Sequence, residues 1–534
     1  MRCLVRLEIH IISYKCLAKI ILILALGISA TNCNNFANKS HPNILFISID
    51  DLRPDLGCYG NTEIKTPNID RFAESGVVFS STYCQAAVCA PSRASLMLGL
   101  RPDSSRVWHL GDKFRVINPG AVTMPQYFHK FGYYTVSLGK IFHNFMPDSV
   151  SWDEPDLRPA PYRTPEMVKR DAETFYFNKK IQESQVTLRA EKLKQRPAAI
   201  NYADGWNVGP AWEDSNAPDS AFYDGAQTDL AIQTLQRLRE KEQPFFIALG
   251  YYRPHLPFVV PKKYWDLYDP DSISLAPNPF LPQDAPIFSM NSMYELRGYE
   301  GFRDIKHPSE FHIPDSSARK LKHGYYASVS YVDACIGRLM SSLDELGLAE
   351  NTVIIIWGDH GWKLGEHNSW CKQTNYEIDT RVPMIIKAPG GTAKGTTSDA
   401  LTELVDIFPT LCDLAGIDKP DYLQGTSAAP LLDQPDKPWK EAVFSQFHRR
   451  PRITPDGKRY MGYSMRTKRY HYIEWYYWDN EKKITTDFVA RELYDHAIDP
   501  QENKNIALQP TNAEIIDELA QKLHAGWRAA RPSL

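Results

Sequence analysis

Four short apolar runs constrain the fold of this chain more than any other feature of its sequence. Each is rich in β-branched or aromatic residues and is typical of a strand buried on both faces. The runs are Asn43–Ile49, Tyr133–Leu138, Phe245–Leu249 and Val353–Trp357. Helix-prone segments alternate with them up to about residue 415. This alternation predicts an α/β fold with a doubly wound, mostly parallel sheet. One helix is expected to begin at Thr66-Pro67, with Thr66 as its N-cap.

Polar residues follow each of these runs at its carboxyl end. They are Asp50-Asp51 after the first run, Lys140 and His143 after the second, His255 after the third and Asp359-His360 after the fourth. In an open parallel sheet, ligands bind in the crevice beyond the carboxyl ends of the strands, so separate strands can deliver these groups to one place. Three carboxylates favour a hard divalent cation, most simply calcium. Taken singly, each group also fits a solvated strand end or a structural role.

The motif Cys89-Ala90-Pro91-Ser92-Arg93 indicates a particular chemistry. Cys-x-Pro-x-Arg is the pattern at which sulfatases have a cysteine oxidised to formylglycine, whose hydrated aldehyde can attack sulfur and later expel sulfate. The motif is short, and by itself it also fits a buried or disulfide-bonded cysteine beside a turn proline. The carboxylates and cations at the strand ends favour the first interpretation. Lys372, in a polar loop that follows Asp359-His360, is a candidate second cation for a sulfate oxygen.

Longer segments resemble those of a known family, the type I or formylglycine-dependent sulfatases, and within it the iduronate-2-sulfatase branch. The resemblance extends from about Pro42 to near Lys504. The segments that carry it are Asn43–Gly60, Cys84–Asp103, Ser137–His143, Gly250–Phe258, Tyr326–Leu339, Gly358–Trp370 and Met461–Tyr472. Asp50–Pro54 and Pro254–Phe258 resemble the iduronate branch more than the arylsulfatases. The resemblance implies an alkaline-phosphatase-like fold with a smaller C-terminal α+β domain.

The resemblance also implies a metal site and a modified residue. Cys89, converted to formylglycine (3-oxoalanine), would be the nucleophile and one ligand of a single calcium ion. The other ligands would be Asp50, Asp51, Asp359 and His360. Conversion of Cys89 would require a formylglycine-generating maturase as a partner.

The remaining candidate residues would, by the same resemblance, bind the sulfate and move protons. Arg93 would neutralise and orient the aldehyde hydrate. Lys140 and His143 would lie beside the hydrate, with His143 as the catalytic base. His255 and Lys372 would bind the sulfate and help to protonate the leaving sugar oxygen.

The composition of the chain limits its partners and sets its size class. It has 534 residues, 61 of them basic and 64 acidic, with a formal net charge of -3, and it has no Lys/Arg-rich tract that would indicate nucleic-acid binding. A chain of this length can bury a large core and is expected to hold two domains. We expect a catalytic domain over residues 40–432 and a smaller domain over residues 440–534. The smaller domain is expected to have antiparallel strands over Tyr460–Trp478 and a terminal helix from about Asn512 to Ala530.

Residues 1–33 are expected to form a signal peptide. Basic residues precede the apolar run Ile20–Ala30, which is too short to span a bilayer but suits a secretory h-region. Cys33 loosely fits a bacterial lipoprotein cleavage site, so a lipid anchor at Cys33 and ordinary signal cleavage are both open. We therefore predict export, to the periplasm, the cell surface or the medium. The other cysteines are too few and too scattered for a disulfide framework.

The leading functional hypothesis is an exported sulfatase acting on a sulfated oligosaccharide or polysaccharide. The 2-O-sulfate of iduronate or of a related uronate is the favoured substrate, and another glycan sulfatase specificity is open. A phosphodiesterase or phosphonate hydrolase of the alkaline phosphatase superfamily is the alternative, and a non-catalytic carbohydrate-binding protein is a third. Trp362, His367 and the insertion Ser149–Pro218 are candidates for setting the choice of sugar. The insertion equally fits a solvated loop that touches no substrate.

Overall fold

The computed structural model describes residues 41–143, 146–159, 176–184, 187, 209–451 and 454–532. The predicted signal peptide and Cys33 lie outside these residues, as does much of the predicted insertion Ser149–Pro218. By its internal contacts, Pro42–Leu534 forms one compact unit, and the predicted division into two domains stays a prediction. Among the described residues, no helix is both long and apolar enough to cross a membrane.

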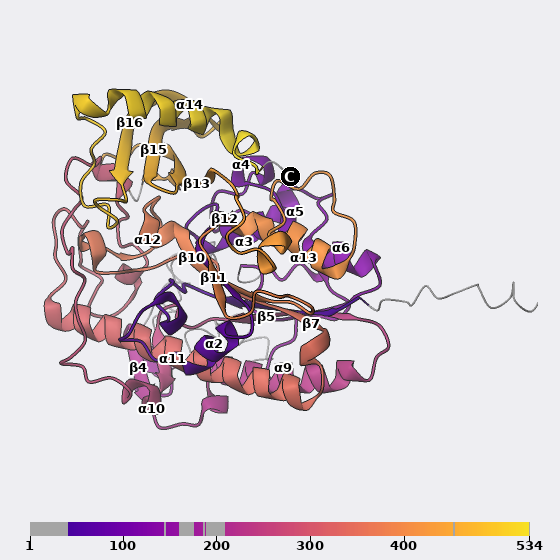
Figure 1. Ribbon diagram of the computed structural model, residues 1–534. Helices are drawn as coiled ribbons and strands as arrows, with labels where there is room; N and C mark the ends of the chain where they lie inside the picture. Colours follow the sequence, from indigo (N-terminus) through magenta and orange to yellow (C-terminus); the bar gives the residue numbers. More distant parts are fainter. Residues whose placement is uncertain are drawn as a thin grey trace, which may run out of the picture. The chain divides into compact units, whose positions relative to one another are not determined.

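An eight-stranded sheet forms the centre of this unit, in the order β11-β2-β10-β7-β1-β5-β3 with β12 beside β2 (Figure 1). Its strands are β1 (Asn43–Ile49), β2 (Val77–Tyr83), β3 (Tyr134–Gly139), β5 (Phe245–Tyr251), β7 (Thr352–Gly358), β10 (Arg381–Lys387), β11 (Thr396–Ser398) and β12 (Thr402–Glu403). β1 pairs in parallel with β5 and β7, β3 pairs in parallel with β5, and β10 runs antiparallel to both of its neighbours. The four predicted strands are β1, β3, β5 and β7, so the predicted α/β fold with a mostly parallel sheet is confirmed.

Helices cover both faces of the sheet (Figure 1). One layer contains α2 (Pro67–Ala73), α9 (Tyr223–Arg239) and α11 (Asp315–Glu345), and the other contains α3 (Cys89–Leu98), α6 (Met124–Lys130) and α13 (Ile407–Ala415). Two hydrophobic clusters reflect these layers, because successive side chains of a strand point to opposite faces. Leu45 of β1 belongs to one cluster together with Leu235 of α9, whereas Phe46 belongs to the other together with Leu411 of α13.

Shorter elements complete the larger part of the chain. The helices are α4 (Pro102–Ser105), α5 (Phe114–Ile117), α10 (Lys262–Trp265) and α12 (Glu377–Thr380). Two small sheets pair β4 (Trp212–Ser215) with β6 (Phe258–Pro261), and β8 (Lys363–Leu364) with β9 (Trp370–Cys371). The β8–β9 pair fixes the loop between the carboxyl end of β7 and Lys372.

The N-terminus of α2 is built differently from the sequence prediction. The helix begins at Pro67 with Thr66 in the N-cap position, but the Thr66 side chain makes no capping hydrogen bond to the helix backbone. Thr66 Oγ1 instead accepts a hydrogen bond from the backbone N–H of Gly57 at 2.9 Å and lies 3.2 Å from the Asp70 carboxylate. A contact with the preceding loop therefore replaces the predicted cap.

The C-terminal part of the chain forms a four-stranded antiparallel sheet and a helix. The elements are β13 (Ala442–Arg449), β14 (Tyr460–Thr467), β15 (Tyr470–Asp479), β16 (Ile484–Asp495) and α14 (Ala513–Ala529). Leu519 of α14 packs in one hydrophobic cluster with Met465 of the sheet. Trp475 belongs to a second cluster with Tyr376, which precedes α12. Aromatic residues of this sheet thus fill the core between it and the rest of the chain.

The edge strand β13 also supports the loop that leads to Cys89. The Ser445 hydroxyl donates a hydrogen bond to the backbone oxygen of Cys84 at 2.5 Å. The Gln446 backbone N–H donates to the backbone oxygen of Gln85 at 2.8 Å. Since Cys84 and Gln85 follow β2 directly, the C-terminal sheet helps to hold the entry into α3.

Candidate active site

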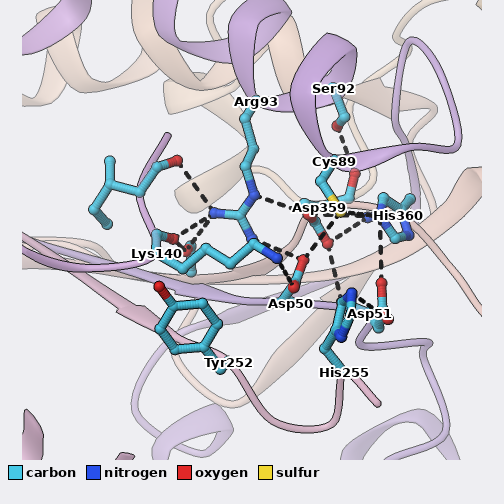
Figure 2. Close-up of polar contacts among 12 residues, drawn as sticks. Asp50, Asp51, Cys89, Ser92, Arg93, Lys140, Tyr252, His255, Asp359 and His360 are labelled. Carbon is cyan, nitrogen blue, oxygen red and sulfur yellow. Dashed lines mark hydrogen bonds and ion pairs between the residues drawn. The ribbon is translucent and has the colours of Figure 1, made fainter. Parts of the chain in front are cut away.

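Most of the predicted site residues lie close together at one edge of the central sheet (Figure 2). β1, β3, β5 and β7 are parallel, so the loops that follow them begin at the same edge. Asp50, Lys140, His255 and Asp359 all lie in these loops. Cys89 comes from another direction, as the first residue of the buried helix α3. A group at position 89 therefore lies at a helix N-terminus, where the backbone N–H groups favour an anion.

Four side chains form a cluster of the kind that holds a metal ion. Asp50, Asp51, Cys89 and His360 are all buried, and each offers one ligand atom within 4.8 Å of the others. Cys89 Sγ lies 3.4 Å from Asp50 Oδ1 and 3.2 Å from His360 Nε2. Asp359, also a predicted ligand, is not a member of this cluster, but its Oδ2 lies 3.6 Å from His360 Nε2.

The carboxylate oxygens of this donor set suit a hard divalent cation, and the sulfur of Cys89 does not. Carboxylate oxygens suit calcium, whereas thiolate sulfur is a soft ligand that suits other metals. An oxygen in place of Cys89 Sγ would make the donor set consistent. Burial and the charge of Asp50 raise the pKa of the Cys89 thiol well above its usual range, so the encoded side chain is a poor thiolate nucleophile.

Arg93 holds two of the predicted metal ligands in place. Its fully buried guanidinium donates from Nε to Asp359 Oδ2 at 2.9 Å, and its Nη2 lies 3.3 Å from Asp50 Oδ1. Nη1 donates to Ser48 Oγ at 3.0 Å and to the backbone oxygen of Ile141 at 3.1 Å. Arg93 thus orients the carboxylates of the site, and its predicted contact with an aldehyde hydrate stays a prediction.

Lys140 adds a second cation beside Asp50. Its ammonium forms a buried ion pair with Asp50 Oδ2 and lies 5.5 Å from the centre of the Tyr252 ring. Burial alone would raise the pKa of Asp50, but the charges of Lys140, His255 and Arg93 hold this pKa well below its usual range. Asp50 is therefore ionised at neutral pH and available to a cation.

Lys372 and His255 lie on the Asp51 side of the cluster and share a carboxylate that the sequence analysis did not identify. Lys372 Nζ donates to Asp51 Oδ1 at 2.7 Å and to Glu295 Oε1 at 2.9 Å. His255 Nε2 lies 3.1 Å from the same Glu295 oxygen. Burial opposes protonation of His255, but the nearby Asp51 and Glu295 carboxylates raise its pKa to about 9. Glu295 lies in an irregular loop without periodicity or a motif, so no sequence signal singled it out.

Asp51, His255 and Glu295 could also hold a metal ion, but the Lys372 ammonium contacts both carboxylates. A positive charge is therefore already present between them. Trp362, which is 1% exposed, lies against this ammonium, with its ring centre 4.8 Å from Lys372 Nζ. A role of Trp362 in binding sugar stays a prediction.

Two other candidate residues, His143 and His367, are not members of the carboxylate–imidazole cluster. His143 lines a small pocket with Ala90 and Arg93, beside the first turn of α3. Burial and the charge of Lys140 lower the pKa of His143 well below its usual range, so its imidazole is neutral at neutral pH. His367 is buried, and its Nε2 lies 2.8 Å from the backbone oxygen of Gln501, so it joins the β7 loop to the C-terminal part of the chain.

Comparisons with known proteins agree with this geometry. Residues 42–417 match the family model "Sulfatase", and residues 365–528 match "N-sulphoglucosamine sulphohydrolase, C-terminal". The chain is 34% identical over 525 residues to iduronate 2-sulfatase of Mus musculus, which covers 87% of this chain and 90% of the relative.

Solved structures of low sequence identity share the fold. A protein solved with its substrate D-glucosamine-2-N,6-O-disulfate has a TM-score of 0.68 and 22% identity, covering 92% of this chain and 98% of that one. A phosphonate monoester hydrolase of Agrobacterium radiobacter has a TM-score of 0.66 and 22% identity, covering 91% and 95%.

Fold and site together define a protein of the alkaline-phosphatase-like α/β architecture with a buried acidic site at the carboxyl ends of its parallel strands. Within this class, the chain belongs to the sulfatase family, enzymes that hydrolyse sulfuric esters. The predicted resemblance to the sulfatases, and to their iduronate branch, is confirmed.

Proposed function

We propose that this sulfatase is exported and removes sulfate from a sulfated glycan, with the 2-O-sulfate of iduronate or a related uronate as its preferred group. The observation that carries the proposal is the position of Cys89, which belongs to a carboxylate–imidazole cluster whose Asp50 and Asp51 side chains pair with the cations Lys140 and Lys372. The identity with mouse iduronate 2-sulfatase over most of both chains supports the choice of sugar.

The site is completed, in this proposal, by one calcium ion and by formylglycine at position 89. Asp50, Asp51, Asp359 and His360 would hold the ion together with residue 89, and a maturase would oxidise Cys89 after synthesis. When bound, calcium supplies positive charge to a sulfate oxygen, and the hydrated aldehyde supplies the oxygen nucleophile.

The side chains around position 89 have separate tasks in this mechanism. Arg93 holds the Asp50 and Asp359 carboxylates so that their oxygens face the cluster. Lys140 and Lys372 place fixed positive charge where the sulfate oxygens would lie, and such preorganised charge is usually the largest catalytic contribution.

Two imidazoles suit opposite proton transfers. His255, whose pKa is raised to about 9, can carry a proton at Nε2 for the leaving sugar oxygen. His143, which is neutral because burial lowers its pKa, can accept a proton from a hydroxyl at position 89.

The location of the protein is part of the proposal. The apolar run Ile20–Ala30 after a basic segment supports a signal peptide over residues 1–33. Cys33 is the candidate for lipid attachment, which would place the enzyme on a membrane surface. A sulfated polysaccharide outside the cytoplasm would then be accessible to it.

A phosphonate or phosphate ester is the competing substrate class, because a phosphonate monoester hydrolase shares the fold. The ammonium of Lys372, which contacts both Asp51 and Glu295, favours a single-metal sulfatase site over a second metal ion at this position.

The test combines a mass measurement with a substrate panel. The protein is produced in a host that matures sulfatases, and the mass of the proteolytic peptide containing Cys89 is determined. The panel contains a disaccharide with a 2-O-sulfated uronate, the same disaccharide with 6-O-sulfated glucosamine only, and a phosphonate monoester, with Cys89→Ala as the blank. We expect an aldehyde at position 89 and calcium-dependent release of sulfate from the first substrate. Faster turnover of either other substrate would overturn the specificity, and an unmodified thiol in an active preparation would overturn the mechanism.

A further inference from the structure

Glu295 joins the two donors on the Asp51 side of the site. A single oxygen, Oε1, lies 3.1 Å from His255 Nε2 and 2.9 Å from Lys372 Nζ. The side chain is only 11% exposed, so water screens these contacts weakly. His255 and Lys372 come from different loops, one after β5 and the other after β9. Glu295 comes from a third segment and connects them.

Each of these donors also has partners other than Glu295. The His255 ring is held on its other side, where Nδ1 lies 2.5 Å from the backbone oxygen of Leu256. Lys372 Nζ is held on its other side by Asp51, at 2.7 Å and 3.0 Å from the two carboxylate oxygens. Asp51 Oδ2 also lies 3.9 Å from His255 Nε2, so both carboxylates lie near both donors, and Glu295 makes the closer contact with His255.

We propose that Glu295 is a positioning residue of the sulfate pocket, which fixes His255 and Lys372 relative to each other and to position 89. The inference rests on the proposed function, since it assigns these two groups to the sulfate and the leaving oxygen. Glu295 acts in two ways. The length of its side chain lets one carboxylate oxygen contact both donors and fix their separation, and its negative charge weakens the attraction of the pocket for sulfate.

These two effects predict opposite changes in turnover and in affinity. Glu295→Gln keeps the shape but removes the charge, so inorganic sulfate should inhibit at least about fivefold more tightly, which is the effect of removing a like charge about 4 Å from an anion even at the dielectric constant of water. The kcat should fall roughly 10- to 100-fold, because an uncharged amide holds the two donors more weakly, and misplacing a catalytic group by about 1 Å has an effect of this size. A residue that only stabilised the fold would lower the active fraction and leave KM and sulfate inhibition unchanged.

Glu295→Asp separates the effect of the negative charge from the effect of the side-chain length. The shorter side chain keeps the negative charge but cannot contact both donors, so sulfate inhibition should return to the wild-type value while kcat stays low. Glu300→Gln is the matched control, because Glu300 is an exposed acid in the same segment. It should leave all constants unchanged.

The experiment measures kcat, KM and inhibition by inorganic sulfate for matured wild type and the three variants, with circular dichroism to confirm folding. Wild-type kcat together with wild-type sulfate inhibition in Glu295→Gln would overturn the positioning role. If that variant does not fold, wild-type kcat in Glu295→Asp would overturn it. A wild-type enzyme that releases no sulfate from any ester would instead overturn the proposed function, so the two failures are distinguishable.

Discussion

Replacing Arg93 by methionine tests the central structural argument about the site. Methionine fills the buried space of the aliphatic part of the Arg93 side chain, but it offers no hydrogen-bond donor. The change removes the donor to Asp359 Oδ2 at 2.9 Å and the longer contact with Asp50 Oδ1 at 3.3 Å. Both carboxylates are fully buried, so neither gains water in exchange.

The size of the effect follows from these two contacts. A hydrogen bond to a charged group contributes about 1.5–3 kcal/mol, and the Asp50 contact lies at the long end of the range for such bonds. Together they give about 3–5 kcal/mol, which is also the usual cost of removing one partner from a buried ion pair. Calcium should recover part of this loss, since a ligand at a hundredfold excess over its Kd stabilises the native state by about 2.7 kcal/mol.

The assay is urea unfolding, followed by tryptophan fluorescence, with EDTA and with calcium. Trp357, whose ring centre lies 5.6 Å from the Arg93 guanidinium carbon, reports on this region. Arg71→Met is the control, because Arg71 is exposed on α2 and its loss should change stability by less than about 0.5 kcal/mol. Equal stability of wild type and Arg93→Met in EDTA would refute the argument that Arg93 holds the carboxylates together.

Four further predictions follow from other parts of the structure. Cys89→Ala should abolish sulfate release while the circular dichroism spectrum stays that of wild type, and residual activity in a matured preparation would contradict the proposed nucleophile. Asp359→Asn should weaken calcium binding, measured by calorimetry, together with kcat; a calcium affinity equal to that of wild type would exclude Asp359 as a ligand. Glu403→Gln should lower the free energy of unfolding by about 3–5 kcal/mol, because Glu403 pairs with both Arg101 at 2.6 Å and Lys440 at 2.7 Å in a buried network; a loss below about 1 kcal/mol would be too small for such a network. Burial lowers the pKa of His109 to about 2 and of His448 to about 3. Below the unfolded pKa of about 6.5, the unfolded chain therefore binds more protons than the native protein. The free energy of unfolding should fall as the pH is lowered from about 7 to about 5. The double variant His109→Gln/His448→Gln should have a flatter profile in thermal unfolding, and an identical slope would show that other groups cause it.

Four buried strands and the polar residues at their carboxyl ends could be predicted from the sequence. Continuous apolar runs identify strands buried on both faces, and parallel strands present their carboxyl ends at one edge. This reasoning places Asp50, Lys140, His255 and Asp359 in loops at one edge. The Cys-x-Pro-x-Arg motif adds Cys89 to the candidate residues, and the structure places it at the start of a helix. These features depend on residues close together in the chain.

Contacts between separate segments determined the side-chain partners that the sequence did not predict. The Thr66 hydroxyl bonds to the loop at Gly57 in place of the helix that follows it. His367 contacts Gln501, which lies far along the chain. Glu295 meets His255 and Lys372 only because three loops pack together. Local periodicity determines which segments become strands and helices, since it reflects burial along the backbone. Which donor faces which acceptor is determined by the packing of distant segments, and for that reason only the tertiary structure identifies Glu295.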